Sequence, residues 1–94
     1  MKSLDPKTVL ERVRAGELRL LDLRTKAERR RYGAPPGAEH ASLARHLVHP
    51  EGPGFVYLCQ HAVRSKLTLR NGAAEVAGGF SAWRDAGLPV DEAD

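Results

Sequence analysis

The chain has 94 residues, of which 41% are hydrophobic and 29% are charged, and its formal net charge is +3. This length allows a single domain over residues 1–94, and this balance predicts a folded domain with one modest core rather than a disordered chain. Because the sequence holds no apolar run long enough for a signal peptide or a membrane span, and its one cysteine excludes an intrachain disulfide, we expect a cytoplasmic protein with a free thiol.

Helix and strand signals alternate through the first half of the chain. Ser3 or Asp5 is a candidate cap for a first helix that Gly16 ends, and Thr25 and Glu28 form a capping box at the start of a second. In chain order we expect that first helix, a buried strand over 18–23, a helix from Thr25 to about Tyr32, a short strand over 38–41 and a helix capped by Ser42 through about Val48.

The second half continues this alternation. It begins with the clearest strand of the chain, Phe55-Val56-Tyr57-Leu58. We then expect a short helix from Ser65 to about Arg70, a strand over 73–77, and a final helix turn capped by Ser81 and ended by Gly87. Alternating helices and strands with short connections predict an α/β fold with a mainly parallel sheet.

A cysteine directly follows the clearest strand, in the run Cys59-Gln60-His61-Ala62-Val63-Arg64-Ser65. In a parallel sheet, ligands bind at the carboxyl ends of the strands, and the N–H groups of a tight loop and a helix start attract anions. Arg64 adds a permanent positive charge that would favour the reactive thiolate. From this spacing alone, a buried and inert core cysteine explains the pattern equally well.

Three stretches of the sequence extend this picture. The first is Asp22-Leu-Arg24 with Glu28, followed by Gly33-Ala-Pro-Pro-Gly-Ala38; the second is Val56-Tyr-Leu-Cys59 with Arg64-Ser65; the third is Gly78-Gly-Phe-Ser-Ala-Trp83 followed by Gly87-Leu-Pro-Val90. In this order they resemble the signatures of the rhodanese-like family, and together they span residues 18 to 90. The resemblance implies a sheet of about five mainly parallel strands with short helices on both faces.

The resemblance also implies an activity. Sulfane sulfur would move from thiosulfate or a similar anionic donor to Cys59, which would carry it as a persulfide, and then to an acceptor such as cyanide or a protein thiol. The backbone of Gln60, His61, Ala62, Val63, Arg64 and Ser65 would hold the donor, with Arg64 attracting it. His61 would either contact the donor or simply face solvent. No cofactor and no metal are implied.

Other signature residues are interpreted as structural. Asp22 and Arg24 would tie the first strand to neighbouring loops through charge-assisted hydrogen bonds. Trp83 would anchor the core with its indole N–H satisfied, and Gly78 and Gly79 would supply backbone freedom or close approach at a bend.

The loop length favours sulfur chemistry over phosphate chemistry. Four residues separate Cys59 from Arg64, whereas the phosphatase relatives of this fold have five, which make a wider cradle. We also weigh a sulfur-relay partner that passes its persulfide to another protein, and a non-catalytic interaction module that keeps the fold without turnover. Either is compatible with the resemblance.

The sequence departs from the family pattern in three places. Ala62 stands where most active members carry glycine, which would cost on the order of 1 kcal/mol if the position needs a positive φ. Ala34 replaces a signature histidine, and His40 is too far along to substitute for it with certainty. The interval 66–77 is short, so the helix after the loop has room for about two turns, and the sheet edge or one face of the sheet would be more exposed than usual.

The partners expected from these features are few. The densest basic run, Arg29-Arg30-Arg31, has neither zinc-ligand spacing nor interleaved aromatic residues, so we interpret it as a solvated helix face rather than a nucleic-acid site. We expect a small anionic sulfur donor, a protein thiol as a candidate acceptor, no membrane, and a monomer or weak homodimer.

Overall fold

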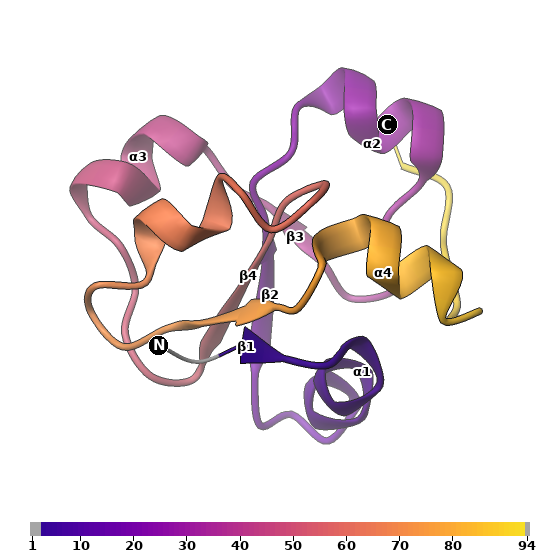
Figure 1. The fold of residues 1–94 in the computed structure, drawn as a ribbon, viewed down its shortest axis with the longest axis horizontal. Helices are drawn as coiled ribbons and strands as arrows, with labels where there is room; N and C mark the ends of the chain where they lie inside the picture. The colour runs from indigo at the N-terminus through magenta and orange to yellow at the C-terminus, as the bar shows by residue number, and fades with distance from the viewer. Residues whose placement is uncertain (1–2, 94) are drawn as a thin grey trace.

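Five parallel strands form one sheet at the centre of the computed structural model, which describes residues 3–93. The strands are β1 (Ser3–Leu4), β2 (Arg19–Asp22), β3 (Glu39–His40), β4 (Phe55–Leu58) and β5 (Ala74–Val76). Their spatial order is β1-β5-β4-β2-β3, and every pair is parallel (Figure 1). Strand β4, which leads to Cys59, is therefore central. The predicted α/β fold with a parallel sheet is confirmed.

Four helices and one 3-10 turn connect these strands. They are α1 (Pro6–Arg14), α2 (Lys26–Tyr32), α3 (Leu43–Val48), η1 (Ser65–Thr68) and α4 (Gly79–Asp85). The capping predictions hold for α1, α2 and α3: Asp5 accepts from the Thr8 N–H, Thr25 and Glu28 form the capping box, and Ser42 accepts from the Arg45 N–H.

Two expectations about the elements are wrong, and of the two candidate caps for the first helix only Asp5 takes that position. Ser3 lies in β1, paired with Glu75 of β5, and caps no helix, because this two-residue strand is too short to leave a pattern in the sequence. The segment after Ser65 forms only the four-residue turn η1 instead of a helix to Arg70. Helix α4 begins at Gly79 rather than at Ser81, because the Phe80 and Ser81 N–H groups are bonded to carbonyls of the cysteine loop.

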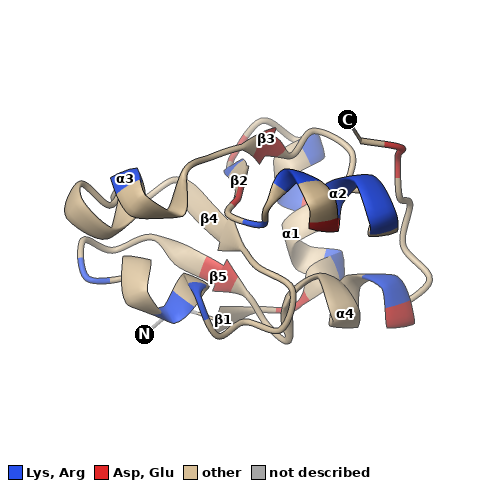
Figure 2. Cartoon of the chain, turned by 90° about the horizontal axis from the view of Figure 1, so that it is seen from above, with Lys and Arg blue, Asp and Glu red and all other residues tan. Residues whose placement is uncertain are grey.

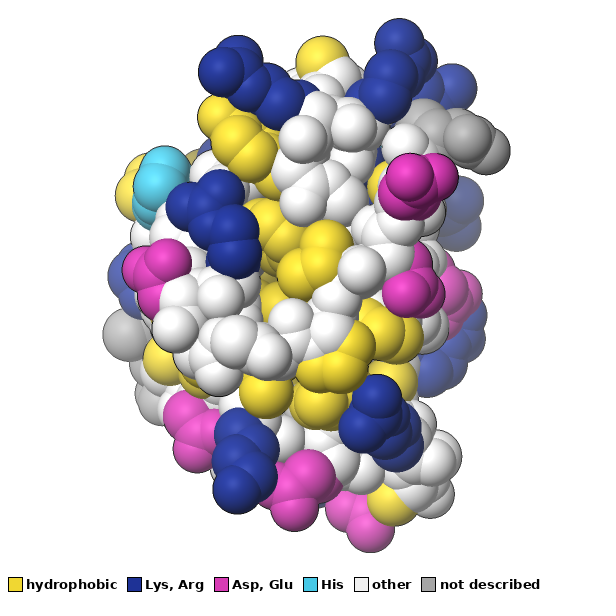
Figure 3. Space-filling model, turned by 90° about the vertical axis from the view of Figure 1, so that its right-hand side faces the viewer, with side chains coloured by type: hydrophobic (Ala, Val, Ile, Leu, Met, Phe, Trp, Pro, Cys, Tyr) yellow, Lys and Arg dark blue, Asp and Glu magenta, His cyan; other side chains and the backbone are white. Residues whose placement is uncertain are grey.

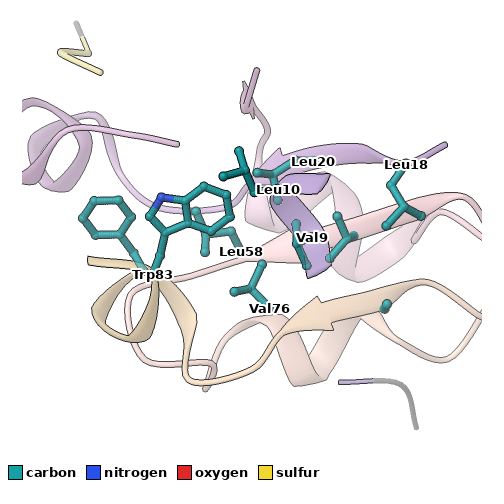
Figure 4. Close-up of a cluster of buried hydrophobic side chains, with 10 residues drawn as sticks. Val9, Leu10, Leu18, Leu20, Leu58, Val76 and Trp83 are labelled. Atoms are coloured by element: carbon teal, nitrogen blue, oxygen red, sulfur yellow. The ribbon is translucent and has the colours of Figure 1, made fainter. Parts of the chain in front are cut away.

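Two apolar clusters fill the two faces of the sheet. The larger contains Val9 and Leu10 from α1 and Trp83 from α4, packed on β2, β4 and β5; Figure 4 shows Trp83 beside Leu58 and Val76. The smaller lies on the opposite face, where α3 and η1 meet, and consists of Leu21, Leu23, Tyr57 and Ala73. This arrangement confirms helices on both faces of the sheet.

Helix α2 differs from the other helices because it contributes no buried side chain. It lies near the carboxyl ends of β2 and β4, and Figure 2 shows its run of basic residues. Arg29 bonds Asp22 at 3.1 Å, and Glu28 bonds Arg64 of the cysteine loop. Ion pairs and hydrogen bonds, rather than apolar packing, therefore hold α2 over the site.

The surface offers little unpaired sheet edge. The edge strands β1 and β3 are each two residues long, so the exposed edge expected from the short interval 66–77 is small.

On the face seen in Figure 3, hydrophobic side chains occupy the middle, with basic and acidic side chains around them. Within residues 3–93, every helix is too short and too polar to cross a membrane.

Candidate active site

The single cysteine lies at the carboxyl end of the central strand, as the sequence predicts. Its thiol is buried, with only 1% of the residue exposed, and within residues 3–93 its hydrogen bonds are to one residue, Ser65. The Ser65 N–H donates to Cys59 Sγ at 3.4 Å, and the Ser65 hydroxyl oxygen lies 3.5 Å from the sulfur. The sulfur therefore sits in a hydrogen-bonding environment and not among apolar side chains alone.

The start of α4 fixes the loop that follows the cysteine. The Phe80 N–H donates to the Cys59 carbonyl at 2.9 Å, and the Ser81 N–H and hydroxyl both donate to the Gln60 carbonyl, at 3.0 and 2.9 Å. These bonds engage the loop carbonyls. The N–H groups of residues 60–64 have no acceptor in the described part of the chain, so they are available to bind an anion.

The backbone at position 62 has a positive φ, which is the conformation in which alanine is strained. Ala62 has φ of +59° and is the only non-glycine residue within 3–93 with a positive φ. An L residue with a Cβ pays on the order of 1 kcal/mol for this conformation. The loop thus keeps a glycine-like backbone at a position that carries alanine.

We expect Ala62→Gly to stabilise the protein by up to about 1 kcal/mol, because relief of the left-handed strain exceeds the added entropy of the unfolded chain. Urea unfolding measures the change. The matched control is Ala27→Gly inside α2, where glycine should cost roughly 1 kcal/mol. Equal destabilisation by both substitutions would contradict a strained backbone at Ala62.

Arg64 closes the loop, but its charge already has a partner. Its two terminal nitrogens donate to the two carboxylate oxygens of Glu28, each at 2.8 Å. This fork raises the pKa of the Arg64 guanidinium, and the nearby Cys59 raises it to a smaller degree. Arg64 was expected to attract the anion, and Glu28 was expected in a capping box and in the first signature; the structure joins the two side chains across α2 and the loop.

The same fork lowers the pKa of Glu28 to about 2, mainly through the hydrogen bond from Arg64. A lowered carboxyl pKa contributes stability above its ordinary value of 4.5, and this contribution is lost as pH falls towards 2. We therefore expect the protein to be more stable than its Glu28→Gln variant at neutral pH, and the difference to vanish near pH 2. Thermal unfolding of both proteins across this range checks it, and a pH-independent difference would contradict it.

A pocket of about 370 Å³ opens beside the loop. Its walls come from α2 and the cysteine loop: Ala27, Glu28, Arg31, Tyr32, Gln60, His61 and Arg64. His61 is exposed there, with Nδ1 2.7 Å from the Ser81 hydroxyl. Cys59 does not line this pocket, so the sulfur lies behind the loop and only a small reagent would reach it.

The side chains of the loop residues expected to hold a donor differ in burial and in hydrogen bonding. Gln60 is buried and its Oε1 accepts from Arg24 at 3.3 Å, Val63 is 69% exposed, and Ser65 is fully buried beside the sulfur. The backbone N–H groups, rather than these side chains, therefore form the shared feature of the loop. Among the residues that the structure describes, no group of three or more His, Cys, Asp or Glu side chains is placed to hold a metal ion.

The first signature pair is buried beneath the loop. The Asp22 carboxylate accepts from Arg24 N, Nε and Nη2 at 2.8 to 3.2 Å, and both side chains are 0% exposed. Arg24 also donates to the Gly33 carbonyl at 2.7 Å and lies 4.1 Å from the centre of the Phe80 ring. The pair thus links β2 to the segment after α2, to the cysteine loop and to α4.

The glycines and the tryptophan lie where close packing is needed. Gly78 and Gly79 have φ of +72° and +67°. A Cβ on Gly79 would come within 2.5 Å of the Cys59 carbonyl oxygen, so the loop and α4 approach as closely as backbone atoms allow. Trp83 is fully buried and donates its indole N–H to the Pro89 carbonyl at 2.8 Å.

Sequence reasoning missed one residue of this region, Glu75. It lies on β5 with its carboxylate fully buried, and it accepts hydrogen bonds from Ser65 at 2.8 Å and Lys66 at 2.6 Å. The signal was present, since a carboxylate inside the apolar strand predicted over 73–77 is unusual without a buried partner.

The fold and the loop together define a class: α/β proteins in which a central parallel strand delivers a cysteine to a loop of unpaired amides. Neither a protein-family model nor a curated protein matches the sequence. Among solved structures, the chain is similar to a rhodanese-like domain protein from Staphylococcus aureus, with 24% identity over 96% of this chain and 98% of that one and a TM-score of 0.71. The chain therefore has the rhodanese-like fold, as its motifs predict.

Two further structures are similar over most of their length. One is a Rhodopseudomonas palustris protein of unknown function described as a possible tyrosine phosphatase, with 25% identity over 97% of this chain and 85% of that one and a TM-score of 0.79. The other is the polysulfide-sulfur transferase homodimer of Wolinella succinogenes, with 25% identity over 96% of this chain and 77% of that one and a TM-score of 0.71. Sulfur-transfer proteins are thus among its structural neighbours.

Proposed function

We propose that the protein is a sulfurtransferase in which Cys59 takes sulfane sulfur from a small anionic donor and carries it as a persulfide. The observation that carries this proposal is the position of the Cys59 sulfur, beneath a loop whose amides at residues 60–64 have no acceptor within the described chain. Those amides would bind the oxygens of the donor and then the terminal sulfur of the persulfide.

Thiosulfate illustrates the balance of the reaction. The Cys59 thiolate attacks the outer sulfur of the donor, an S–S bond forms on the enzyme, and the S–S bond of thiosulfate breaks to release sulfite with its electron pair. A second nucleophile, cyanide or a thiolate, then takes the outer sulfur and returns Cys59 to the thiolate. No metal or external oxidant takes part in either step.

The loop length argues against phosphate ester chemistry. Four residues separate Cys59 from Arg64 in the sequence, and the Arg64 guanidinium is bonded at both ends of its fork to Glu28. The four-residue interval makes a narrower cradle than the five-residue interval of the phosphatase relatives of this fold, and this narrower cradle favours sulfur over phosphate chemistry. The similarity to a possible tyrosine phosphatase makes this comparison worth measuring.

The test is persulfide formation on the purified protein. After treatment with thiosulfate, and separately with polysulfide, intact-protein mass spectrometry should show one added sulfur atom, and Cys59→Ser should show none. Hydrolysis of an aryl phosphate should be absent in both proteins. Absence of any sulfur adduct with both donors would overturn the proposal, and hydrolysis of the aryl phosphate that depends on Cys59 would replace it with phosphatase chemistry.

The acceptor is addressed by a second arm of the same experiment. Rapid conversion of the persulfide by cyanide or a small thiol would mark a free-standing enzyme. A stable persulfide that small acceptors discharge slowly would mark a sulfur-relay partner, whose physiological acceptor is a protein thiol. No adduct, with Cys59 unreactive towards small thiol reagents, would mark an interaction module.

A further inference from the structure

Glu75 is a buried carboxylate that has no role in the proposed sulfur transfer. It is 0% exposed on β5, where its register partner is Tyr57 of β4. Its Oε1 accepts from the Ser65 hydroxyl at 2.8 Å, and its Oε2 accepts from the Lys66 ammonium at 2.6 Å. Burial of a carboxylate is costly unless it is hydrogen-bonded and paired, so its position behind the cysteine needs a reason.

Ser65 connects this carboxylate to the sulfur. The residue is fully buried, its hydroxyl oxygen lies 3.5 Å from Cys59 Sγ, and the same hydroxyl donates to Glu75. A hydroxyl has one proton to donate and lone pairs with which to accept. While Ser65 donates to the carboxylate, it faces the sulfur with a lone pair, which suits a thiol S–H and not a thiolate.

We propose that Cys59 and Glu75 share one proton through Ser65, so that Glu75 acts as a positioning residue for the nucleophile. The inference rests on the proposed sulfur transfer for its purpose. The thiol proton passes to Ser65 Oγ while the Ser65 hydroxyl proton passes to Glu75 Oε1. The result is a thiolate that accepts a hydrogen bond from Ser65 and a neutral Glu75 that donates one. No electron is transferred, and the summed charge of the two groups stays at one negative.

The burial of Cys59 explains why its thiol needs an internal proton acceptor. Because Cys59 is 1% exposed and lies behind the loop, solvent is poorly placed to remove its proton. An internal acceptor lets the negative charge move to sulfur when an anionic donor is bound. It also lets the charge return to the carboxylate when the cysteine rests, held there by Lys66.

The surrounding charges act on the two ends in opposite senses. Lys66 favours the charge on Glu75. Arg64, whose pKa is raised first by Glu28 and then by Cys59, favours the charge on sulfur. Other charged or titratable groups of the adjoining elements are bonded elsewhere: Glu28 of α2 to Arg64, Asp22 of β2 to Arg24 and Arg29, His46 of α3 to Tyr57 of β4, and His61 of the loop to Ser81 of α4.

The pH dependence of cysteine reactivity distinguishes this relay from a structural role. Methyl methanethiosulfonate is a small neutral probe that transfers its methylthio group to a thiolate and releases methanesulfinate. If two groups share one proton, the logarithm of the rate has a flat region at intermediate pH, where the thiolate fraction is constant, and rises again only when the last proton is lost. A lone thiol instead loses about tenfold in rate per pH unit below its titration.

We expect the wild-type protein to show the flat region and Glu75→Gln to lose it, so that the variant reacts at least about tenfold more slowly near pH 5. Glutamine keeps an oxygen that accepts from Ser65, which preserves the fold. Ser65→Ala should lose the flat region as well, and Lys66→Met should raise it. Glu39→Gln, a surface carboxylate on β3, is the matched control and should leave the profile unchanged.

A single tenfold-per-unit line in the wild-type protein, or a flat region that survives in both Glu75→Gln and Ser65→Ala, would overturn the relay. Neither result depends on persulfide formation, because the probe needs no sulfur donor. A protein that forms the persulfide but shows the single line would keep the proposed function and lose only this inference. A protein that shows the flat region but forms no sulfur adduct would support the relay and contradict the proposed sulfur transfer.

Discussion

Gly79→Ala should disrupt the cysteine loop and lower the free energy of unfolding by at least about 2 kcal/mol. Its Cβ would lie 2.5 Å from the Cys59 carbonyl oxygen, 2.7 Å from the Ala62 nitrogen and 2.8 Å from the Gln60 carbonyl oxygen. These are backbone atoms of the loop, so no side-chain rotation relieves the overlap. The left-handed φ of +67° adds on the order of 1 kcal/mol.

The matched control for this substitution is Gly16→Ala. Gly16 has a similar φ of +75°, but a Cβ there would meet nothing within 4 Å. It should therefore cost only the conformational part, about 1 kcal/mol. Urea unfolding measures both, and the rate of Cys59 modification by a thiol reagent reports on the loop. Equal losses in the two variants, with Cys59 reactivity unchanged, would show that the approach of α4 to the loop is not tight.

The elements that sequence analysis located well are those with local signals. Thr25 and Glu28 form their capping box within one helical turn, and the apolar run at 55–58 needs only its own composition to indicate a buried strand. The position of Cys59 at the carboxyl end of β4 follows from that strand alone. Local chemistry was therefore sufficient to predict an α/β fold with a parallel sheet and to place Cys59 at the end of a strand.

The features that the sequence could not give are long-range in the chain. Glu28 and Arg64 are 36 residues apart, and only the packing of α2 over the loop brings their forks together. Helix α4 begins earlier than its serine predicts, because two of its N–H groups bond carbonyls of a loop about twenty residues away. In both cases a distant backbone or side chain supplies the partner that the local pattern lacks.

The loop is thus defined more by backbone constraint than by its own side chains. Gly79 admits the Cys59 carbonyl, the α4 amides hold two carbonyls, and Ala62 takes a left-handed turn that its side chain disfavours. Each constraint fixes part of the loop backbone, whose amides at residues 60–64 have no acceptor within residues 3–93. A sequence can therefore vary at most loop positions and keep this loop backbone, provided that the contacts from outside the loop persist.

Removal of the Arg24 guanidinium should be the most destabilising side-chain change in the site. Arg24→Met would leave the Asp22 carboxylate buried with only Arg29, at 3.1 Å, as a charged partner, and would remove the donors to Gly33 and Gln60. The loss of one partner from a buried ion pair costs about 3–5 kcal/mol, because the other charge stays desolvated. We also expect faster modification of Cys59, since Gln60 and Phe80 lose a shared contact.

Arg19→Met is the matched control for that change. Arg19 makes a similar fork to Glu39, at 3.0 and 2.7 Å, and also lies over an aromatic ring, that of Phe55, but its side chain is 61% exposed. An exposed pair contributes under about 1 kcal/mol, so urea unfolding should separate the two arginines clearly. Asp22→Asn added to Arg24→Met should recover part of the loss, because it removes the orphaned charge. Equal losses for Arg24→Met and Arg19→Met, or no recovery in the double variant, would show that burial does not determine how much the ion pair contributes to the free energy of unfolding.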